Sequence, residues 1–173
     1  MRGPVTWMIE SGLCIRNSIA KKGVHPLASY CDENKFKLFL FDVGLLNAML
    51  HIPGEAVLGE SLGPYKGYLL ENYVAQELRA QTSGELYSWA EGTAEIEFIY
   101  PCNEAVIPVE VKSAARSRRS KSLDAYIQKY DPPVAVKLSR KNAGFNRDRN
   151  IWSLPVYLSY RLIPLLHSFC SRA

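Results

Sequence analysis

The sequence lacks the short motifs that cradle nucleotide phosphates and the spacings that bind zinc. Neither G-x-x-x-x-G-K-[ST] nor G-x-G-x-x-G occurs in the 173 residues, so we expect no ATP binding by this chain itself. The three histidines lie far apart and the four cysteines form no C-x-x-C pair, which argues against a zinc site. We therefore predict free thiols in a reducing compartment at Cys14, Cys31, Cys102 and Cys170.

Long apolar runs and a strong charge of one sign are missing as well. No stretch reaches about 18 apolar residues, and no basic segment with an apolar core opens the chain. We therefore expect no membrane span and a cytoplasmic protein. The net charge of +4 is mild, so it permits contact with nucleic acid without demanding it. The 47% apolar content is that of a globular chain long enough to bury a core.

What the chain does have is a pair of alternating segments around a turn signal at residues 101–104. Apolar and polar residues alternate over residues 95–100 and again over residues 106–112, which predicts two strands joined as a hairpin. Every second side chain on a strand shares a face. If Tyr100 pairs with Ala105, one face holds Glu95, Glu97, Glu110 and Lys112. The opposite face is then apolar and includes Ile96, Phe98 and Tyr100.

This grouping of charges has a chemical use. Two carboxylates a few Å apart repel one another unless a divalent cation lies between them, and Mg²⁺ prefers oxygen ligands. A neighbouring ammonium group can orient a water molecule or stabilise charge on a phosphate, which completes a metal-assisted phosphodiester hydrolase. The alternative is a solvated strand face, on which cross-strand Glu–Lys pairs are worth only about 0.2–1 kcal/mol each.

The predicted elements follow the order helix, strand, strand–turn–strand, helix, strand. This order indicates an α/β fold with a mixed sheet flanked by helices. The clearest helix spans residues 66–81, where Leu70, Val74 and Leu78 form an apolar stripe with Glu71 beside it. A second helix is predicted at residues 43–50 behind Asp42 as its N-cap. Further helices are predicted at 122–130 and 155–167, and further strands at 35–41, 85–90, 134–138 and 151–153, the first of them buried.

Residues 1–34 have a different pattern from the rest. A short helix ended by Gly12, followed by strands at 13–19 and 24–29, is typical of the second half of a winged helix. The helices that would complete such a module do not precede it, so we expect an amino-terminal part to be missing from this polypeptide. We predict a winged-helix remnant with its linker at residues 1–34 and the main domain at residues 35–173.

A helix with Glu71, a strand with Glu97 and a strand with Glu110-Val111-Lys112 resemble the PD-(D/E)xK nuclease superfamily. Glu110 and Lys112 match the second half of that motif, whereas Glu97 stands where Asp is usual and no proline precedes it. Four stretches in order, at residues 35–46, 71–78, 95–98 and 109–113, are similar to an uncharacterised carboxy-terminal domain of prokaryotic AAA+ ATPases. The likeness covers about residues 10 to 166. In those proteins an ATPase module and a winged helix come first, and this chain lacks the ATPase module.

The resemblance implies a restriction-endonuclease-like core and a role for each matching residue. Glu97 and Glu110 would hold Mg²⁺ or Mn²⁺ with the Val111 carbonyl, and Lys112 would orient the attacking water. Glu71 would hold a second metal ion or its waters, unless it serves only the dipole of its helix. Glu95 could substitute for Glu97.

A basic link follows Lys112 directly in the sequence. Its members, Arg116, Arg118, Arg119 and Lys121, would contact a phosphate backbone, or else form a solvated loop. Two functions follow from the whole pattern. One is a divalent-metal-dependent DNA nuclease, and the other is an inactive module through which DNA or a protein partner is recruited to an ATPase.

Overall fold

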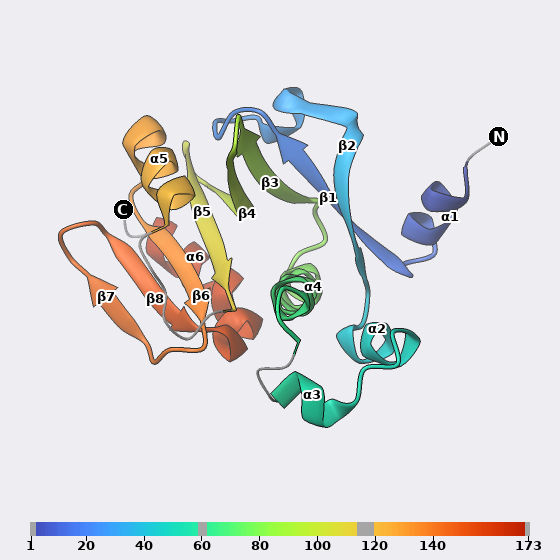
Figure 1. Ribbon diagram of the computed structural model, residues 1–173. Helices are drawn as coiled ribbons and strands as arrows, with labels where there is room; N and C mark the ends of the chain where they lie inside the picture. The colour runs from blue at the N-terminus through green and yellow to red at the C-terminus, as the bar shows by residue number, and fades with distance from the viewer. Residues whose placement is uncertain (1–2, 59–61, 114–119, 172–173) are drawn as a thin grey trace.

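The chain folds around one mixed β-sheet of eight strands (Figure 1). The computed structural model describes residues 3–58, 62–113 and 120–171. The strands follow the spatial order β2-β1-β3-β4-β5-β6-β8-β7, with parallel pairs at β1–β3, β5–β6 and β6–β8. The predicted α/β class with a mixed sheet is confirmed. The strands are β1 (Cys14–Ala20), β2 (Cys31–Leu40), β3 (Leu86–Glu91), β4 (Ala94–Cys102), β5 (Ala105–Lys112), β6 (Ala135–Ser139), β7 (Gly144–Asn146) and β8 (Ile151–Pro155).

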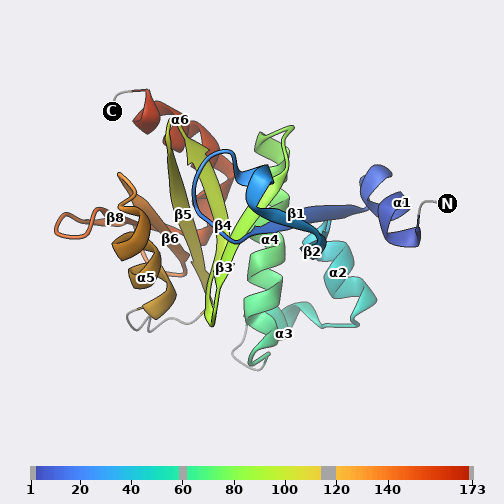
Figure 2. The same ribbon diagram turned by 90° about the horizontal axis from the view of Figure 1, so that it is seen from above.

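The helices lie on both faces of this sheet (Figure 2). They are α1 (Pro4–Glu10), α2 (Val43–Met49), α3 (Gly54–Leu58), α4 (Tyr65–Gln81), α5 (Lys121–Tyr130) and α6 (Leu162–Cys170), with 3-10 helices η1 (Leu27–Tyr30) and η2 (Val156–Arg161). Asp42 caps α2 as predicted, because its Oδ1 accepts a hydrogen bond of 2.6 Å from the Leu45 amide. The single helix predicted at residues 155–167 divides into η2 and α6. In the part of the chain that the structure describes, no helix is both long and apolar enough to cross a bilayer.

Two separate apolar clusters stabilise the two faces. On one face α4 and α6 pack on the sheet, with Val74, Phe98 and Leu166 among the buried residues of that cluster. On the other face α5 and η1 pack on the sheet around Trp89 and Tyr126, whose rings meet edge to face with centroids 5.1 Å apart. Because both faces are covered, β5 is buried along nearly its whole length.

The hairpin of β4 and β5 differs from its predicted register by two residues. Tyr100 pairs with Ile107, and the strands close on a two-residue turn in which Asn103 takes a φ of 53°. Asparagine tolerates this left-handed backbone, so the turn is tighter than the expected four residues. A slip of two residues keeps every side chain on its face, because side chains alternate with a period of two. The expected grouping of the charged residues is therefore unaffected by this difference.

A β-bulge in β4 does change the expected faces. Tyr87 pairs with Ile99 and Trp89 pairs with Ile96, so that two residues of β4, Glu97 and Phe98, lie opposite the single residue Ser88 of β3. As a consequence Ile96 packs in the cluster under α5, while Phe98 packs in the cluster under α4. The prediction that Ile96 and Phe98 share one face is therefore wrong. The bulge lies at Glu97, one of the predicted site residues.

The amino-terminal segment lies in the same sheet as the rest of the chain. β1 pairs parallel with β3, and Ile15 and Ala20 are buried in the two clusters. The predicted boundary at residue 34 falls inside β2, and the origin of residues 1–34 in a winged helix stays a prediction. The strand expected at residues 24–29 is wrong, since η1 occupies Leu27–Tyr30. β2 is also not the buried strand that we expected, because it forms the sheet edge and only Phe39 is buried.

A disulfide joins Cys102 at the end of β4 to Cys170 at the end of α6. The Cα atoms of the two residues are 5.8 Å apart, although 68 positions separate them in the sequence. The prediction of free thiols is therefore wrong for this pair and confirmed for Cys14 and Cys31. The prediction failed for Cys102 and Cys170 because spacing rules detect cysteines that are close in the sequence, whereas this pair meets only because α6 packs against the hairpin end. Asn103 adds to the attachment, since its Nδ2 donates to the Cys170 carbonyl at 2.8 Å.

Candidate functional site

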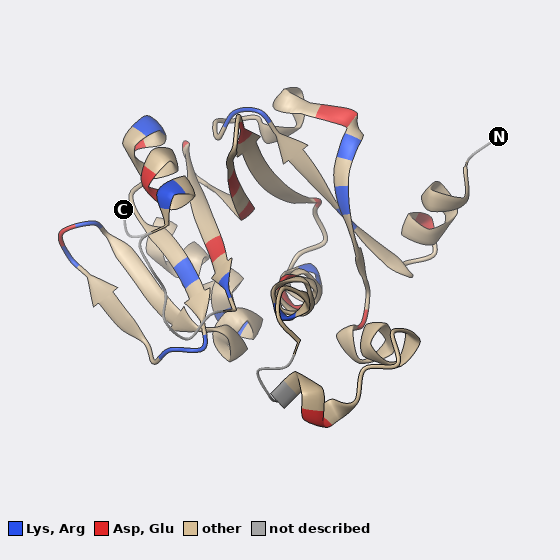
Figure 3. Cartoon of the chain, viewed as in Figure 1, with Lys and Arg blue, Asp and Glu red and all other residues tan. Residues whose placement is uncertain are grey.

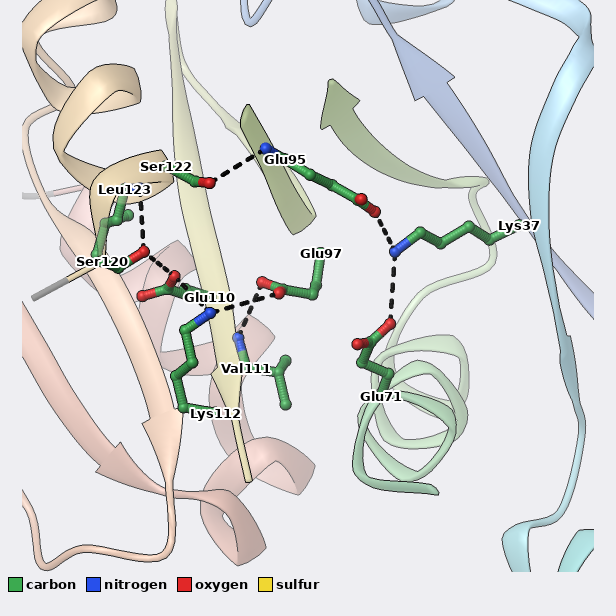
Figure 4. A network of polar contacts seen from close by, with 10 residues as sticks. All are labelled: Lys37, Glu71, Glu95, Glu97, Glu110, Val111, Lys112, Ser120, Ser122 and Leu123. Carbon is green, nitrogen blue, oxygen red and sulfur yellow. Dashed lines mark hydrogen bonds and ion pairs between the residues drawn. The ribbon is translucent and has the colours of Figure 1, made fainter. Parts of the chain in front are cut away.

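Adjacent strands bring three of the predicted residues together (Figure 4). Lys112 Nζ lies 2.9 Å from Glu110 Oε1 and 3.9 Å from Glu97 Oε1. Glu97 comes from β4 and the other two residues from β5. We call Glu97, Glu110 and Lys112 the Lys112 cluster. One ammonium group therefore faces two carboxylates that the fold holds within reach of a shared partner.

Glu110 is the most constrained member of this cluster. Its side chain has no exposed surface, and its Oε1 accepts hydrogen bonds from Lys112 and from Ser120 Oγ. Ser120 also caps α5 by accepting from the Leu123 amide at 3.3 Å, so the helix start and the carboxylate hold each other in place. Glu110 Oε2 is buried and has no hydrogen-bond partner among the described residues. A carboxylate oxygen in that state is energetically unfavourable unless a ligand completes its bonding.

Glu97 is held through both its side chain and its backbone. Its Oε2 accepts a hydrogen bond of 3.1 Å from the Val111 amide, and its carbonyl accepts one of 3.1 Å from Asn17 Nδ2. Asn17 is itself fully buried on β1, and it therefore contacts the backbone at the bulge. Burial raises the pKa of Glu97 to about 7, although Lys112 and the Val111 amide act in the opposite direction. The carboxylate is thus easily protonated near neutral pH.

A second group of three charges lies beside the first. Lys37 Nζ, from β2, forms ion pairs with Glu71 Oε2 at 3.4 Å and with Glu95 Oε1. We call Lys37, Glu71 and Glu95 the Lys37 cluster. The two clusters influence each other electrostatically, because Glu71 contributes to the pKa of Lys112 and Glu97 contributes to that of Lys37. The arrangement is therefore two neighbouring lysines, each between two carboxylates.

Both lysines stay charged in this setting. Burial alone would lower the pKa of Lys112, but its hydrogen bond to Glu110 and the surrounding carboxylates raise the pKa above its usual value. The pKa of Lys37 is raised in the same way, against burial, by Glu95, Glu71 and Glu97. Lys137 behaves differently. Burial and the charges of Lys112 and Lys141 lower its pKa, although Glu110 opposes them.

A divalent cation fits the Lys112 cluster better than the Lys37 cluster. Glu110 Oε2 is a buried oxygen without a hydrogen-bond partner among the described residues, and Mg²⁺ is usually bound by one or two carboxylates with several waters. No group of three or more His, Cys, Asp and Glu side chains in the described residues is arranged to hold a metal ion together. A site here would consequently rest on two carboxylates and water. Glu71, which was expected to hold a second metal ion or its waters, binds Lys37 instead.

The predicted residues do not all meet at one place. Glu97, Glu110 and Lys112 converge, whereas Glu71, and Glu95 that was expected beside Glu97, bind Lys37 in the second cluster. Val111 was expected to offer its carbonyl, and the contact that the structure shows is its amide donating to Glu97. Lys121 is exposed at the first turn of α5. Arg116, Arg118 and Arg119 lie outside the described residues.

Sequence reasoning missed three residues that shape the site. Lys37 was part of a stretch that carried the resemblance, yet no role followed for it from the pattern. Asn17 and Ser120 reach the site through contacts that cross 80 and 10 positions of the sequence. Only Ser120 had a local signal, because a serine before an apolar helix is a typical N-cap.

The chain matches one known protein family. The domain described as "Domain of unknown function (DUF4143)" matches residues 66–158, which is more than half of the chain and includes Glu71, Glu97, Glu110 and Lys112. No curated protein and no solved structure matches the chain. Lys37 and Asn17 lie before the matched segment.

Proposed function

The chain belongs to the DUF4143 family of domains of unknown function, and for this member we propose a metal-dependent phosphodiesterase acting on DNA. The proposed fold of its core is that of the PD-(D/E)xK nucleases, and the proposed setting is the carboxy-terminal part of an AAA+ ATPase system in the cytoplasm. The observation that carries the proposal is the Lys112 cluster, in which a charged lysine lies between two carboxylates. One of them, Glu110, is buried and has an oxygen without a hydrogen-bond partner in the described part of the chain.

Each residue of the cluster has a role in this proposal. Glu110 and Glu97 would hold one Mg²⁺ or Mn²⁺, with Glu110 Oε2 as the oxygen that is free to bind it. When bound, the ion would polarise a phosphate oxygen and lower the pKa of a coordinated water. Lys112 stays protonated because its pKa is raised, so it acts as a charge that positions water and stabilises the phosphate, and not as a general base. Ser120 and Asn17 are positioning residues for Glu110 and Glu97.

Basic residues beside the cluster support a polyanionic substrate. Lys137 is the register partner of Glu110 on the next strand, β6. Further Lys and Arg positions lie in the loop after β6 and in the loop between β7 and β8 (Figure 3). The described members of this group include Lys137, Arg140, Lys141 and Arg147. A phosphate backbone that passes over the ends of β5 and β6 would meet Lys112, Lys137 and the loop after β6, and such contacts make binding salt-dependent.

The test combines metal binding with cleavage. Titration calorimetry with Mn²⁺ should detect binding to the wild type and none to Glu110→Ala, while Glu104→Ala in the exposed hairpin turn serves as the matched control and should bind as the wild type does. Cleavage of DNA should need the metal and should be lost in both Glu110→Ala and Lys112→Ala, because one variant lacks a metal ligand and the other lacks the ammonium group that stabilises the phosphate. Metal-free cleavage, or cleavage by Glu110→Ala, would contradict the proposal.

One observation favours a second function, an inactive module that binds DNA or a protein partner. Each lysine already forms ion pairs with two carboxylates without any metal. In this alternative the clusters stabilise the fold only, and DNA binding without metal is unchanged by Glu110→Ala. The same titration decides between the two functions, since the inactive module takes up no Mn²⁺ at this site.

A further inference from the structure

We propose that Lys37 permanently fills the place of a second divalent cation, so that the site takes one Mg²⁺ or Mn²⁺ and not two. This inference rests on the proposed function, and it concerns the stoichiometry and the charge of the same site. It assigns a role to Lys37, which lies outside the matched family segment and outside the motif that pointed to the site. It also explains why Glu71 does not join Glu97 and Glu110.

The contacts of Lys37 are those that a bound cation would make. Its ammonium group lies between the carboxylates of Glu71 and Glu95, which come from α4 and from β4 (Figure 4). The Lys37 side chain is 25% exposed and that of Glu71 is 20% exposed, so the pair is partly shielded from water. Opposite charges at such positions attract more strongly than they would at the open surface.

The backbone around Lys37 is tied to the helix that carries Glu71. The buried side chain of Asn72 accepts a hydrogen bond of 2.8 Å from the Leu40 amide and donates one of 3.0 Å to the Leu40 carbonyl. Gln76, one turn further along α4, accepts a hydrogen bond of 2.9 Å from the Val43 amide. β2 is an edge strand, and these bonds hold its end against α4. The fold therefore fixes the position of the Lys37 backbone relative to Glu71, so their contact does not depend on a flexible side chain alone.

The charges of the two clusters leave room for one divalent ion. Four carboxylates, Glu71, Glu95, Glu97 and Glu110, face two ammonium groups, Lys37 and Lys112, when all are ionised. The net charge is then −2, which a single Mg²⁺ neutralises. A second ion would leave the site with a net charge of +2 beside the further cation Lys137, and this is electrostatically unfavourable.

The two clusters also differ in how their carboxylate oxygens are surrounded. In the Lys112 cluster, Glu110 Oε2 is buried and has no hydrogen-bond partner among the described residues. In the Lys37 cluster, one oxygen of each carboxylate contacts Lys37, and both glutamate side chains are partly exposed, so water can bind their other oxygens. The single ion therefore goes to Glu97 and Glu110, and removal of the Lys37 charge should open a second position between Glu71 and Glu95.

The experiment counts Mn²⁺ ions by titration calorimetry on the full chain. The wild type should bind one ion, and Lys37→Met should bind two. Lys35→Met removes a lysine from the exposed part of the same strand and should still bind one ion. Lys37→Gln provides a second neutral variant if Lys37→Met folds poorly, and electron paramagnetic resonance should reveal coupled Mn²⁺ pairs in the neutral variants alone.

The outcomes separate this inference from the proposed function. Two ions in the wild type, or one ion in a folded Lys37→Met and Lys37→Gln, would overturn the role of Lys37 and leave the proposed metal site intact. No bound ion in any variant would overturn the proposed function itself, and the inference with it. One ion in the wild type and two in the neutral variants would support both.

Discussion

The Lys112 cluster and the Lys37 cluster have the same composition and very different surroundings. Each places one lysine between two glutamates, yet the glutamate side chains are 0% and 13% exposed in the first and 20% and 48% exposed in the second. Buried ion pairs are dominated by the loss of hydration, and exposed pairs are screened by water. The same residue types therefore form a buried cluster whose carboxylates have lost most of their hydration in one place, and a partly hydrated ion pair in the other.

This difference identifies burial, and not residue type, as the feature that gives a carboxylate cluster its chemistry. Glu110 keeps one oxygen free of partners among the described residues, and Glu97 has a pKa of about 7. Glu71 and Glu95 each place one oxygen against Lys37, and both side chains are partly exposed to water. Removing a lysine, a proton or a supporting side-chain amide should therefore have different effects on stability and metal binding in the two clusters.

The largest separation should come from removal of each lysine. Lys112→Met leaves Glu110 buried without its cation and should lower the free energy of unfolding by about 3–5 kcal/mol. Lys37→Met acts on more exposed groups and should lower it by about 1 kcal/mol or less. Urea denaturation in the presence of a metal chelator measures both values. Equal losses in the two variants would show that burial does not distinguish the clusters.

A smaller separation should come from pH. Burial raises the pKa of Glu97 from 4.5 to about 7, so between these values the folded protein binds more protons than the unfolded chain. The free energy of unfolding should therefore decrease as the pH rises through this window, by up to about 3 kcal/mol at this position.

The measurement is urea denaturation without metal at several pH values between these limits. Glu97→Gln should remove this part of the slope, while Glu95→Gln in the exposed cluster should leave it in place. If the free energy of unfolding changed with pH in the same way in the wild type and in Glu97→Gln, the pKa of Glu97 would not be raised.

The smallest separation in stability should come from the two buried asparagines, one behind each cluster. Asn17→Ala leaves the Glu97 carbonyl unpaired, and it should cost about 1–2 kcal/mol and weaken Mn²⁺ binding. Asn72→Ala releases the end of β2 at a similar cost, and it should keep the first Mn²⁺ while it loosens the hold of Lys37 on Glu71. Calorimetry and urea denaturation on both variants test this. If Asn72→Ala lowered the affinity for the first Mn²⁺ as much as Asn17→Ala does, the two clusters would not act independently.

Periodicity predicted the parts of the fold that depend on neighbours in the sequence. The α4 helix, the Asp42 cap and the hairpin with Glu97, Glu110 and Lys112 all follow from local patterns. The grouping of these charges tolerated the two-residue error in register because the strand period is two. The bulge at Glu97 had no local signal, since it depends on how β4 pairs with β3. Lys37 could not be placed either, because its position depends on Asn72 holding the edge strand β2.

The disulfide between Cys102 and Cys170 closes the chain into a covalent ring with two tails. Glu110, Lys112 and Ser120 are members of the ring, whereas Glu97, Glu71 and Lys37 belong to the amino-terminal tail, so the Lys112 cluster spans the junction of ring and tail. A single proteolytic cut anywhere between residues 103 and 169 would leave one molecule of unchanged mass apart from one added water. A nicked protein would therefore separate into two fragments on a denaturing gel only after a thiol reductant had opened the ring.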